Sequence, residues 1–173
     1  LMKFLISKII FFFLLVNISQ ANENIRFINI NYIIKNSNAG KILNNIIEKK
    51  NKEFTNELNQ IGKSLEDKKN KIISQKNILK KEEFEKLIKE YDTEVKNFNE
   101  KRKNKTNELN IFNAKSKKKM LDLLNPLIKS YLKKESIQIL LQKEKIVFGD
   151  EKLDITNEIL DSFNSKHKSI KFE

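Results

Sequence analysis

The 173-residue sequence has no cysteine, three glycines, one proline and one histidine, and each shortage excludes a class of function. Without cysteine there is neither a disulfide framework nor a thiol nucleophile. Gly40, Gly62 and Gly149 lie too far apart for a glycine-rich phosphate-binding loop. His167 lies alone in the polar stretch "NSKHKSIKFE", which does not supply the several ligands that a metal needs. We therefore expect no enzyme activity, no cofactor and no metal site.

The first 21 residues, "LMKFLISKIIFFFLLVNISQA", contain an apolar run at 9–16. Two lysines precede this run, and the small residues Ser19 and Ala21 follow it. This order is typical of a secretory signal peptide. The run is shorter than the roughly 20 residues that span a bilayer. We expect residues 1–21 to direct export and to be cleaved; an uncleaved anchor is the alternative.

The charge is unevenly distributed along the chain. Residues 22–173 contain 33 basic and 23 acidic side chains, a net charge of +10. Residues 41–133 alone contain 24 basic and 14 acidic side chains, which account for the whole excess. Such a balance favours nucleic acid or an anionic membrane as partner. Export argues against nucleic acid as the partner, because a nucleic-acid-binding protein would have to stay in the cytoplasm. Mapping the N-terminus of the purified protein tests this alternative, since a start near Asn22 would indicate export.

Residues 41–133 show the apolar 3–4 spacing of two coiled-coil helices. The pattern loses phase near 74–82, which predicts the tip of an antiparallel hairpin with arms of roughly 60–75 Å. The first helix carries the seam residues Ile47, Phe54, Leu58, Ile61, Leu65, Ile72 and Leu79. The second carries Phe84, Ile88, Tyr91, Val95, Phe98, Leu109, Phe112 and Leu123.

Polar side chains interrupt this seam at Lys68, Arg102, Lys105 and Ser116. Polar residues at seam positions lower the stability of a coiled coil, so we expect a slender, flexible rod. Pro126 lies inside the second helix, where a proline removes a backbone hydrogen bond and predicts a kink.

The two ends of the chain, 22–40 and 134–173, predict a small body of about 59 residues. "NIRFINI" reads as a strand, "YIIKNS" as a helical turn, and "SIQILLQ" with "KIVFG" as a β-hairpin. Asn36, Ser37 or Asn38 can cap the first long helix, and Asp154 or Thr156 the last helix. A body this small is marginal alone, and short strands need their edges covered. We expect an oligomer whose strands merge into a shared sheet or barrel.

The order of these segments resembles the Skp/OmpH family of periplasmic chaperones. The resemblance is carried by "NSNAGK", "LLNPLIKSY", "IQILLQ" and "KIVFGDEKLDITNEIL". It implies a mainly α fold with a small β body: a long antiparallel helical hairpin, a coiled-coil tentacle, on a small β-sheet or barrel that forms a homotrimer. It further implies an ATP-independent periplasmic holdase for unfolded outer-membrane proteins. The alternative is an envelope structural coiled coil or adaptor that holds no client.

Within that family role, the basic arms are expected to attract a client, and apolar side chains to make many weak contacts with it. A basic arm would also attract anionic lipid or lipopolysaccharide, and both are kept as candidate partners. The competing interpretation is that the aromatic side chains only pack the hairpin seam. The candidate client-binding residues are Phe54, Phe84, Tyr91, Phe98, Phe112, Lys68, Arg102 and Lys105.

Overall fold

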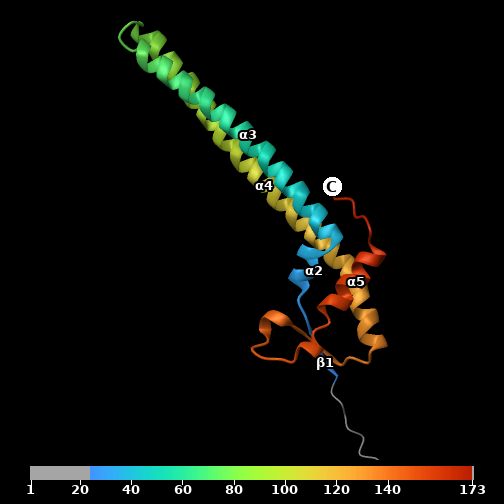
Figure 1. Ribbon diagram of the computed structural model, residues 1–173. Helices are drawn as coiled ribbons and strands as arrows, with labels where there is room; N and C mark the ends of the chain where they lie inside the picture. The colour runs from blue at the N-terminus through green and yellow to red at the C-terminus, as the bar shows by residue number, and fades with distance from the viewer. Residues whose placement is uncertain (1–23, 173) are drawn as a thin grey trace, which may run out of the picture.

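The structure is a computed structural model that describes residues 24–172. A long helical hairpin extends from a small body (Figure 1). Helix α3 (Asn38–Gln75) leads away from the body and helix α4 (Lys81–Lys134) returns to it. The mainly helical architecture predicted from the sequence is confirmed. The predicted signal peptide, residues 1–21, lies outside the described residues.

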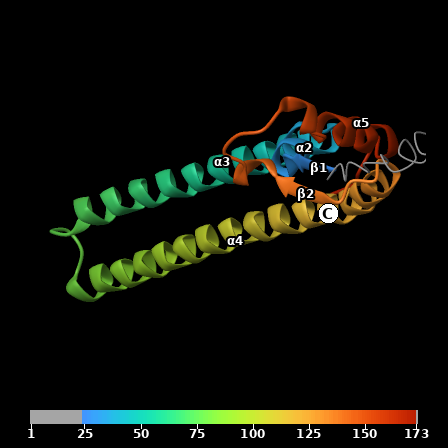
Figure 2. The ribbon, with the colours of Figure 1, turned by 90° about the horizontal axis from the view of Figure 1, so that it is seen from below.

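The two long helices lie side by side and are joined by residues 76–80, inside the interval predicted for the tip (Figures 1 and 2). Glu82 and Glu83 in the first turn of α4 suit the positive end of the helix dipole, and Lys133 and Lys134 suit the negative end. Helix α4 continues through Pro126, so the proline does not end the helix. The predicted kink stays a prediction.

A short helix, α2 (Ile30–Asn36), turns directly into α3. Ser37 caps α3: its hydroxyl oxygen accepts a hydrogen bond from the Gly40 amide at 3.0 Å. One of the three predicted caps is therefore the observed one. The two helices approach so closely that a Cβ at Gly40 would lie 1.8 Å from the Ile34 carbonyl oxygen. The turn "NSNAGK" thus requires glycine at this position.

The strands pair differently from the prediction. β1 (Ile25–Ile28) pairs with β2 (Ile139–Gln142) in parallel, with Ile25 opposite Ile139, and the helices α2, α3 and α4 form the connection between them. The predicted β-hairpin is wrong, because "KIVFG" forms no strand. Residues Lys143–Lys145 instead form the 3-10 helix η1, closed by the Ile146 amide donating to the Lys143 carbonyl at 3.1 Å. "KEK" also lacks the Asn-Gly or Asp-Gly residues that tight hairpin turns favour.

Within residues 24–172 the sheet has these two strands and is open. One hydrophobic core covers it, where α2, the last turns of α4 and helix α5 (Thr156–Lys166) meet. Ile33, Met120, Ile159 and Phe163 are at most 1% exposed. The core therefore lies in the body and at the root of the arm, where Ala39 and Leu43 of α3 and Met120, Leu124, Leu127 and Ile128 of α4 join it.

Candidate functional site

The arm buries little of its seam. Beyond the root of the arm, only Leu65 and Ile72 are buried among the apolar seam residues that the structure describes, and the polar seam residue Ser116 is buried as well. The five predicted aromatic residues are all half-buried, neither enclosed between the helices nor free in solvent: Phe54, Phe84, Tyr91, Phe98 and Phe112. Because part of each ring stays accessible, the geometry allows seam packing and contact with another molecule together.

Phe54 and Phe112 come together with Lys105 in a groove between α3 and α4 near the body. We call it the root groove, and its volume is about 470 Å³. Lys50 lies over one wall, with its Nζ 5.1 Å from the centroid of the Phe112 ring. This volume lies within the range of roughly 300–1,000 Å³ of ligand pockets in proteins. The residues that define the groove are Phe54, Glu57, Lys105, Leu109, Phe112 and Phe172.

A second hollow, of about 290 Å³, lies farther along the arm. Phe98, Ile61 and Leu65 supply its apolar lining, and Glu94 and Lys101 lie at it as well. Both hollows therefore combine an aromatic ring with charged side chains of both signs. Phe84 and Tyr91 line neither of these two hollows.

The predicted cationic residues have three different environments. Lys68 donates across the hairpin to Glu94, with 2.7 Å between Nζ and Oε1, which compensates for its position in the seam. Lys105 pairs with Glu108 on its own helix at 3.1 Å, beside the root groove. Arg102 is exposed and lines a shallow polar hollow with neighbouring asparagines, away from the aromatic rings. The structure thus brings Lys105 to a groove and leaves Arg102 apart.

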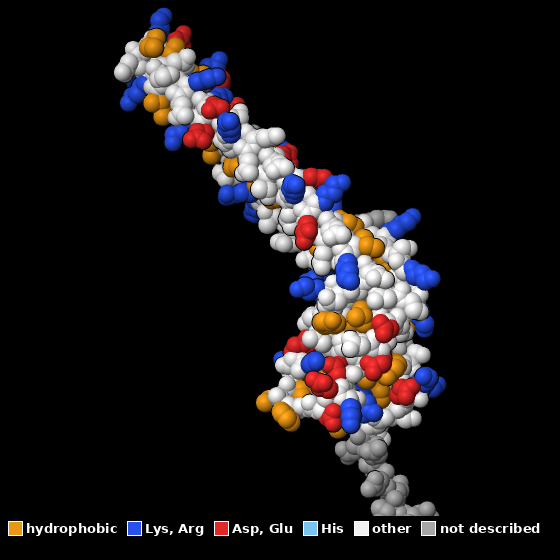
Figure 3. All heavy atoms as spheres, in the orientation of Figure 1, with side chains coloured by type: hydrophobic (Ala, Val, Ile, Leu, Met, Phe, Trp, Pro, Cys, Tyr) orange, Lys and Arg blue, Asp and Glu red, His pale blue; other side chains and the backbone are white. Residues whose placement is uncertain are grey.

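A further ion pair joins the helices between the two hollows. Lys101 Nζ lies 2.5 Å from Glu57 Oε1. This hydrogen bond, followed by the charges of Lys101 and Lys105, lowers the pKa of Glu57. Figure 3 shows basic and acidic side chains interspersed along the arm on the face in view. The surface of the arm is therefore mixed in sign, although its sum is strongly basic.

Sequence reasoning missed Phe172, Lys50 and Ile111, which also line the root groove. Phe172 lies in the stretch that was interpreted as a polar tail. The sequence signal for Phe172 was the alternation of polar and apolar residues in "SIKF", where Ile170 is buried and Phe172 is half-buried. His167 packs its ring 5.0 Å from that of Phe163. Within residues 24–172, no three side chains of the metal-binding types gather as a metal site requires.

The body exposes apolar side chains at the edge of the sheet and in the loop that follows. Val147 is 102% and Phe148 97% exposed, and Ile139 and Leu141 on β2 are 46% and 43% exposed. Hydrophobic side chains are visible at this end of the molecule in Figure 3. Large apolar side chains that are this exposed are candidates for an interaction surface in soluble proteins.

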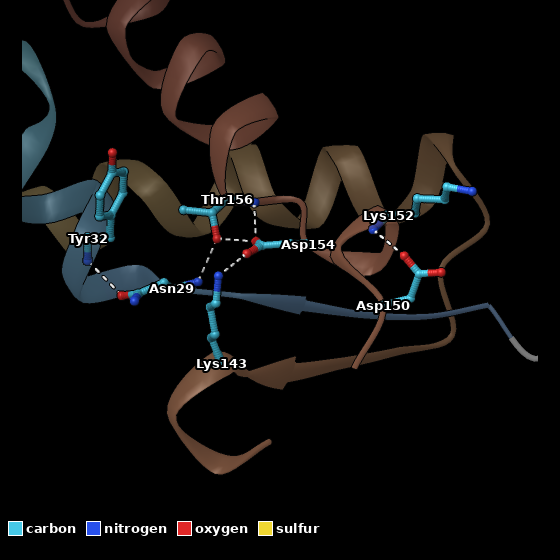
Figure 4. A network of polar contacts seen from close by, with 7 residues as sticks. All are labelled: Asn29, Tyr32, Lys143, Asp150, Lys152, Asp154 and Thr156. Carbon is cyan, nitrogen blue, oxygen red and sulfur yellow. Dashed lines mark hydrogen bonds and ion pairs between the residues drawn. The ribbon is translucent and has the colours of Figure 1, made fainter. Parts of the chain in front are cut away.

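A polar network holds the loop between β2 and α5 in place (Figure 4). Lys143 Nζ lies 2.6 Å from Asp154 Oδ2, and the Thr156 amide donates to Asp154 Oδ1 at 2.9 Å. The Thr156 hydroxyl oxygen accepts from the Asn29 amide at 2.8 Å. Burial opposes ionisation of Asp154, but the hydrogen bonds from Lys143 and Thr156 outweigh it, so the pKa of Asp154 is lowered. The network ties the loop to the junction of β1 and α2.

Comparison with protein families adds a decisive observation. The model of the family described as "Outer membrane protein (OmpH-like)" matches residues 24–163, which include the whole arm and most of the body. This chain belongs to the OmpH-like family. The predicted family resemblance is confirmed.

A solved structure of another OmpH-like protein has the same fold. It is the crystal structure of a candidate outer membrane chaperone from Caulobacter crescentus CB15. The two chains are 15% identical and superpose with a TM-score of 0.79, over 88% of this chain and 90% of the other. The comparison with curated proteins gave no match. Among the helices of residues 24–172, none combines the length and the apolar character needed to cross a bilayer.

Proposed function

We propose that this OmpH-like protein is a periplasmic holdase, which binds unfolded outer-membrane β-barrel proteins without ATP and keeps them soluble for insertion. The observation that carries the proposal is the half-buried row of aromatic residues along a net-basic arm. The 38 residues of α3 extend this arm about 57 Å. Binding alone, without catalysis, accounts for this activity.

The proposed mechanism divides the work between charge and apolar contact. The arm attracts an unfolded acidic precursor over about a Debye length, roughly 8 Å at physiological salt. The accessible parts of Phe54, Phe98 and Phe112 then contact alternate apolar residues of the precursor, each gaining a small energy. Many weak contacts keep the client soluble and releasable. The same charge would hold the arm near anionic lipid or lipopolysaccharide.

The capture experiment uses a urea-unfolded porin that is diluted into buffer while its turbidity is followed. Wild-type protein is expected to suppress the turbidity, and less so as salt is raised. The triple variant Lys63→Gln, Lys69→Gln, Lys71→Gln lowers the charge on exposed arm positions and is expected to weaken capture.

The matched control changes three exposed body lysines to glutamine, Lys145, Lys152 and Lys166. Capture by this control should equal that of the wild type. An equal loss of capture in both triple variants would show that capture depends on the net charge of the whole chain and not on the charge of the arm. Turbidity unaffected by wild-type protein would overturn the proposal.

We further propose that the body assembles into a homotrimer, with the strands joined in a shared barrel. The exposed Val147 and Phe148 and the uncovered face of β2 support this assembly, because burying them against copies would remove apolar surface from water. Light scattering is expected to give three times the mass of one chain. Phe148→Ser should shift the mass toward the monomer, and a monomeric wild type would contradict the assembly.

Residues 1–21 are proposed to direct export to the periplasm and to be removed. Sequencing the N-terminus of the protein purified from its native envelope tests this. A start near Asn22 is expected, whereas an intact leader would support the anchor.

A second function is favoured by the pairs Lys68–Glu94 and Lys101–Glu57, which join the two helices of the arm. Cross-helix ion pairs suit a stiff spacer or adaptor in the envelope that holds no client. The turbidity experiment separates the two functions, because a spacer leaves the precipitation of the porin unchanged.

A further inference from the structure

The segment after α5 folds back onto the arm, beyond the end of the family match at residue 163. Ile170 is 8% exposed and joins the core, while the Lys171 backbone carbonyl accepts a hydrogen bond from Lys119 Nζ at 2.8 Å. Phe172 then reaches the root groove beside Phe54 and Phe112. This tail, residues 168–172, therefore lies against α4 through both its side chains and its backbone.

The tail has the chemistry of the proposed client. In "SIKF" the apolar residues alternate with polar ones, as they do along the strands of a β-barrel membrane protein. Ile170 belongs to the hydrophobic core and Phe172 packs against it, whereas Lys171 between them is exposed. Unfolded barrel segments would present the same alternation to the same groove.

We propose that the root groove binds extended peptide segments with alternating apolar residues, and that residues 168–172 compete for it within the same chain. The inference rests on the proposed function for the identity of the client, and it adds a site and a competitor. Phe54 and Phe112 receive an aromatic side chain, and Lys119 donates to a backbone carbonyl of the bound segment. A client must displace Phe172 in order to bind there.

Such competition makes the apparent affinity proportional to the fraction of time for which the groove is free. A groove free for about a tenth to a third of the time has an apparent Kd raised about three- to tenfold. Phe172→Ala removes the competing ring without changing the groove residues on α3 and α4. It is therefore expected to tighten binding by about three- to tenfold.

Displacement can be observed directly because the chain contains no tryptophan. Phe172→Trp places the chain's single tryptophan at the groove, and its emission, excited at 295 nm to avoid the tyrosines, is expected to shift to longer wavelength when a peptide displaces it. The probe is a short fluorescein-labelled peptide in which Phe and Thr alternate, with binding followed separately by anisotropy. Tyr32→Trp, on α2 in the body, where the tyrosine is 46% exposed, is the matched reporter and should not respond.

Three results would overturn the inference. Peptide binding that leaves the emission of the Phe172→Trp variant unchanged would place the peptide elsewhere, and equal shifts in both reporters would indicate non-specific binding. Phe172→Ala binding the peptide no more tightly than wild type would show that the tail does not compete. In a further test, a free peptide of sequence KHKSIKF is expected to displace the fluorescein peptide from Phe172→Ala.

Replacing Phe112 tests the groove itself. Phe112→Ala is expected to weaken peptide binding, while circular dichroism reports whether the arm stays helical. Combined with Phe172→Trp, the same replacement should shift the tryptophan emission to longer wavelength even without peptide. If the emission of this double variant equals that of Phe172→Trp alone, the ring at position 172 does not occupy the groove.

Failure here is distinguishable from failure of the proposed function. If the protein still suppresses porin turbidity while Phe172→Ala changes nothing, only the competitor is wrong. If neither the wild type nor any variant suppresses porin turbidity, the holdase proposal fails. Peptide binding at the root groove is then still tested by the emission of the Phe172→Trp variant.

Discussion

The body and the arm of this protein are stabilised in opposite ways. In the body, residues such as Ile33, Ile159 and Phe163 are fully enclosed in one continuous cluster. Along the arm beyond its root, Leu65 and Ile72 are the buried apolar side chains among the described residues, and the aromatic rings stay half-exposed. The body carries almost no net charge, whereas residues 41–133 carry +10.

The difference shows where stability is located and where the proposed client contacts would lie. Burial contributes free energy in proportion to the apolar area removed from water, so the body and the root supply most of it. The distal arm keeps apolar surface accessible at the expense of its own stability, and regions with few buried contacts open at lower free energy. A client-binding arm needs such surface, and a small core can anchor it.

The largest expected effect comes from making one substitution in both regions. Phe163→Ala removes a ring that is 1% exposed and should lower the free energy of unfolding by about 3–5 kcal/mol. Phe98→Ala removes a half-buried ring and should cost about 1 kcal/mol. Urea unfolding followed by circular dichroism, at one protein concentration, measures both. Equal costs would contradict the division between body and arm.

Two glycines give the next comparison. Gly40→Ala would place a Cβ 1.8 Å from the Ile34 carbonyl oxygen, so the α2–α3 turn must shift, at a cost of about 1–3 kcal/mol. At Gly62, inside α3, a Cβ would meet no atom within 4 Å, so Gly62→Ala should stabilise the helix by about 0.5–1 kcal/mol. Thermal unfolding of the two variants should therefore shift in opposite directions. A shift of the same sign in both would contradict the close approach at Gly40.

The arm was predictable because a coiled coil is specified by local spacing. Ile47, Phe54 and Ile61 recur every seven residues, and the loss of phase near 74–82 predicts the tip. Capping at Ser37 follows from a similarly local rule. Which aromatic rings share a groove was not predictable, because that depends on the register of α3 against α4.

The body was less predictable because its contacts join distant parts of the chain. β1 pairs with β2 across the entire helical hairpin. The missing turn residues in "KEK" argue against a β-hairpin with "KIVFG", but no local pattern indicates β1 as the partner of β2. The role of Phe172 was missed for the same reason. Its partners Phe54 and Phe112 are far away in sequence, and the lysines around it made the tail look solvated.

The Asp154–Lys143 pair predicts a pH dependence confined to the body. The pKa of Asp154 is lowered, so its contribution is complete above the ordinary value of 3.8 and is lost as pH falls through the native pKa. The hydrogen bond to Asp154 raises the pKa of Lys143, whose contribution is lost only as pH rises above 10.5.

Asp154→Asn should remove the acid-dependent part of this stability, a loss of less than about 1 kcal/mol at neutral pH. The free energies of unfolding of wild type and variant should differ above about pH 4 and converge as pH falls through the lowered native pKa of Asp154, as measured by intrinsic tyrosine fluorescence between about pH 2 and 7. Parallel curves over that range would indicate that the carboxylate contributes nothing through its charge.

The smallest expected effect lies in the arm, at the pair Lys101–Glu57. Its side chains are 41% and 43% exposed, so water and salt screen the two charges and the coupling between them should be small. A double-mutant cycle with Lys101→Met and Glu57→Gln measures this coupling by urea unfolding. In about 1 M salt, where the Debye length is about 3 Å, we expect it to fall. A coupling that persists in salt would mean that packing of the two stems, not charge, joins the helices there, and the arm would then be stiffer than its half-exposed seam suggests.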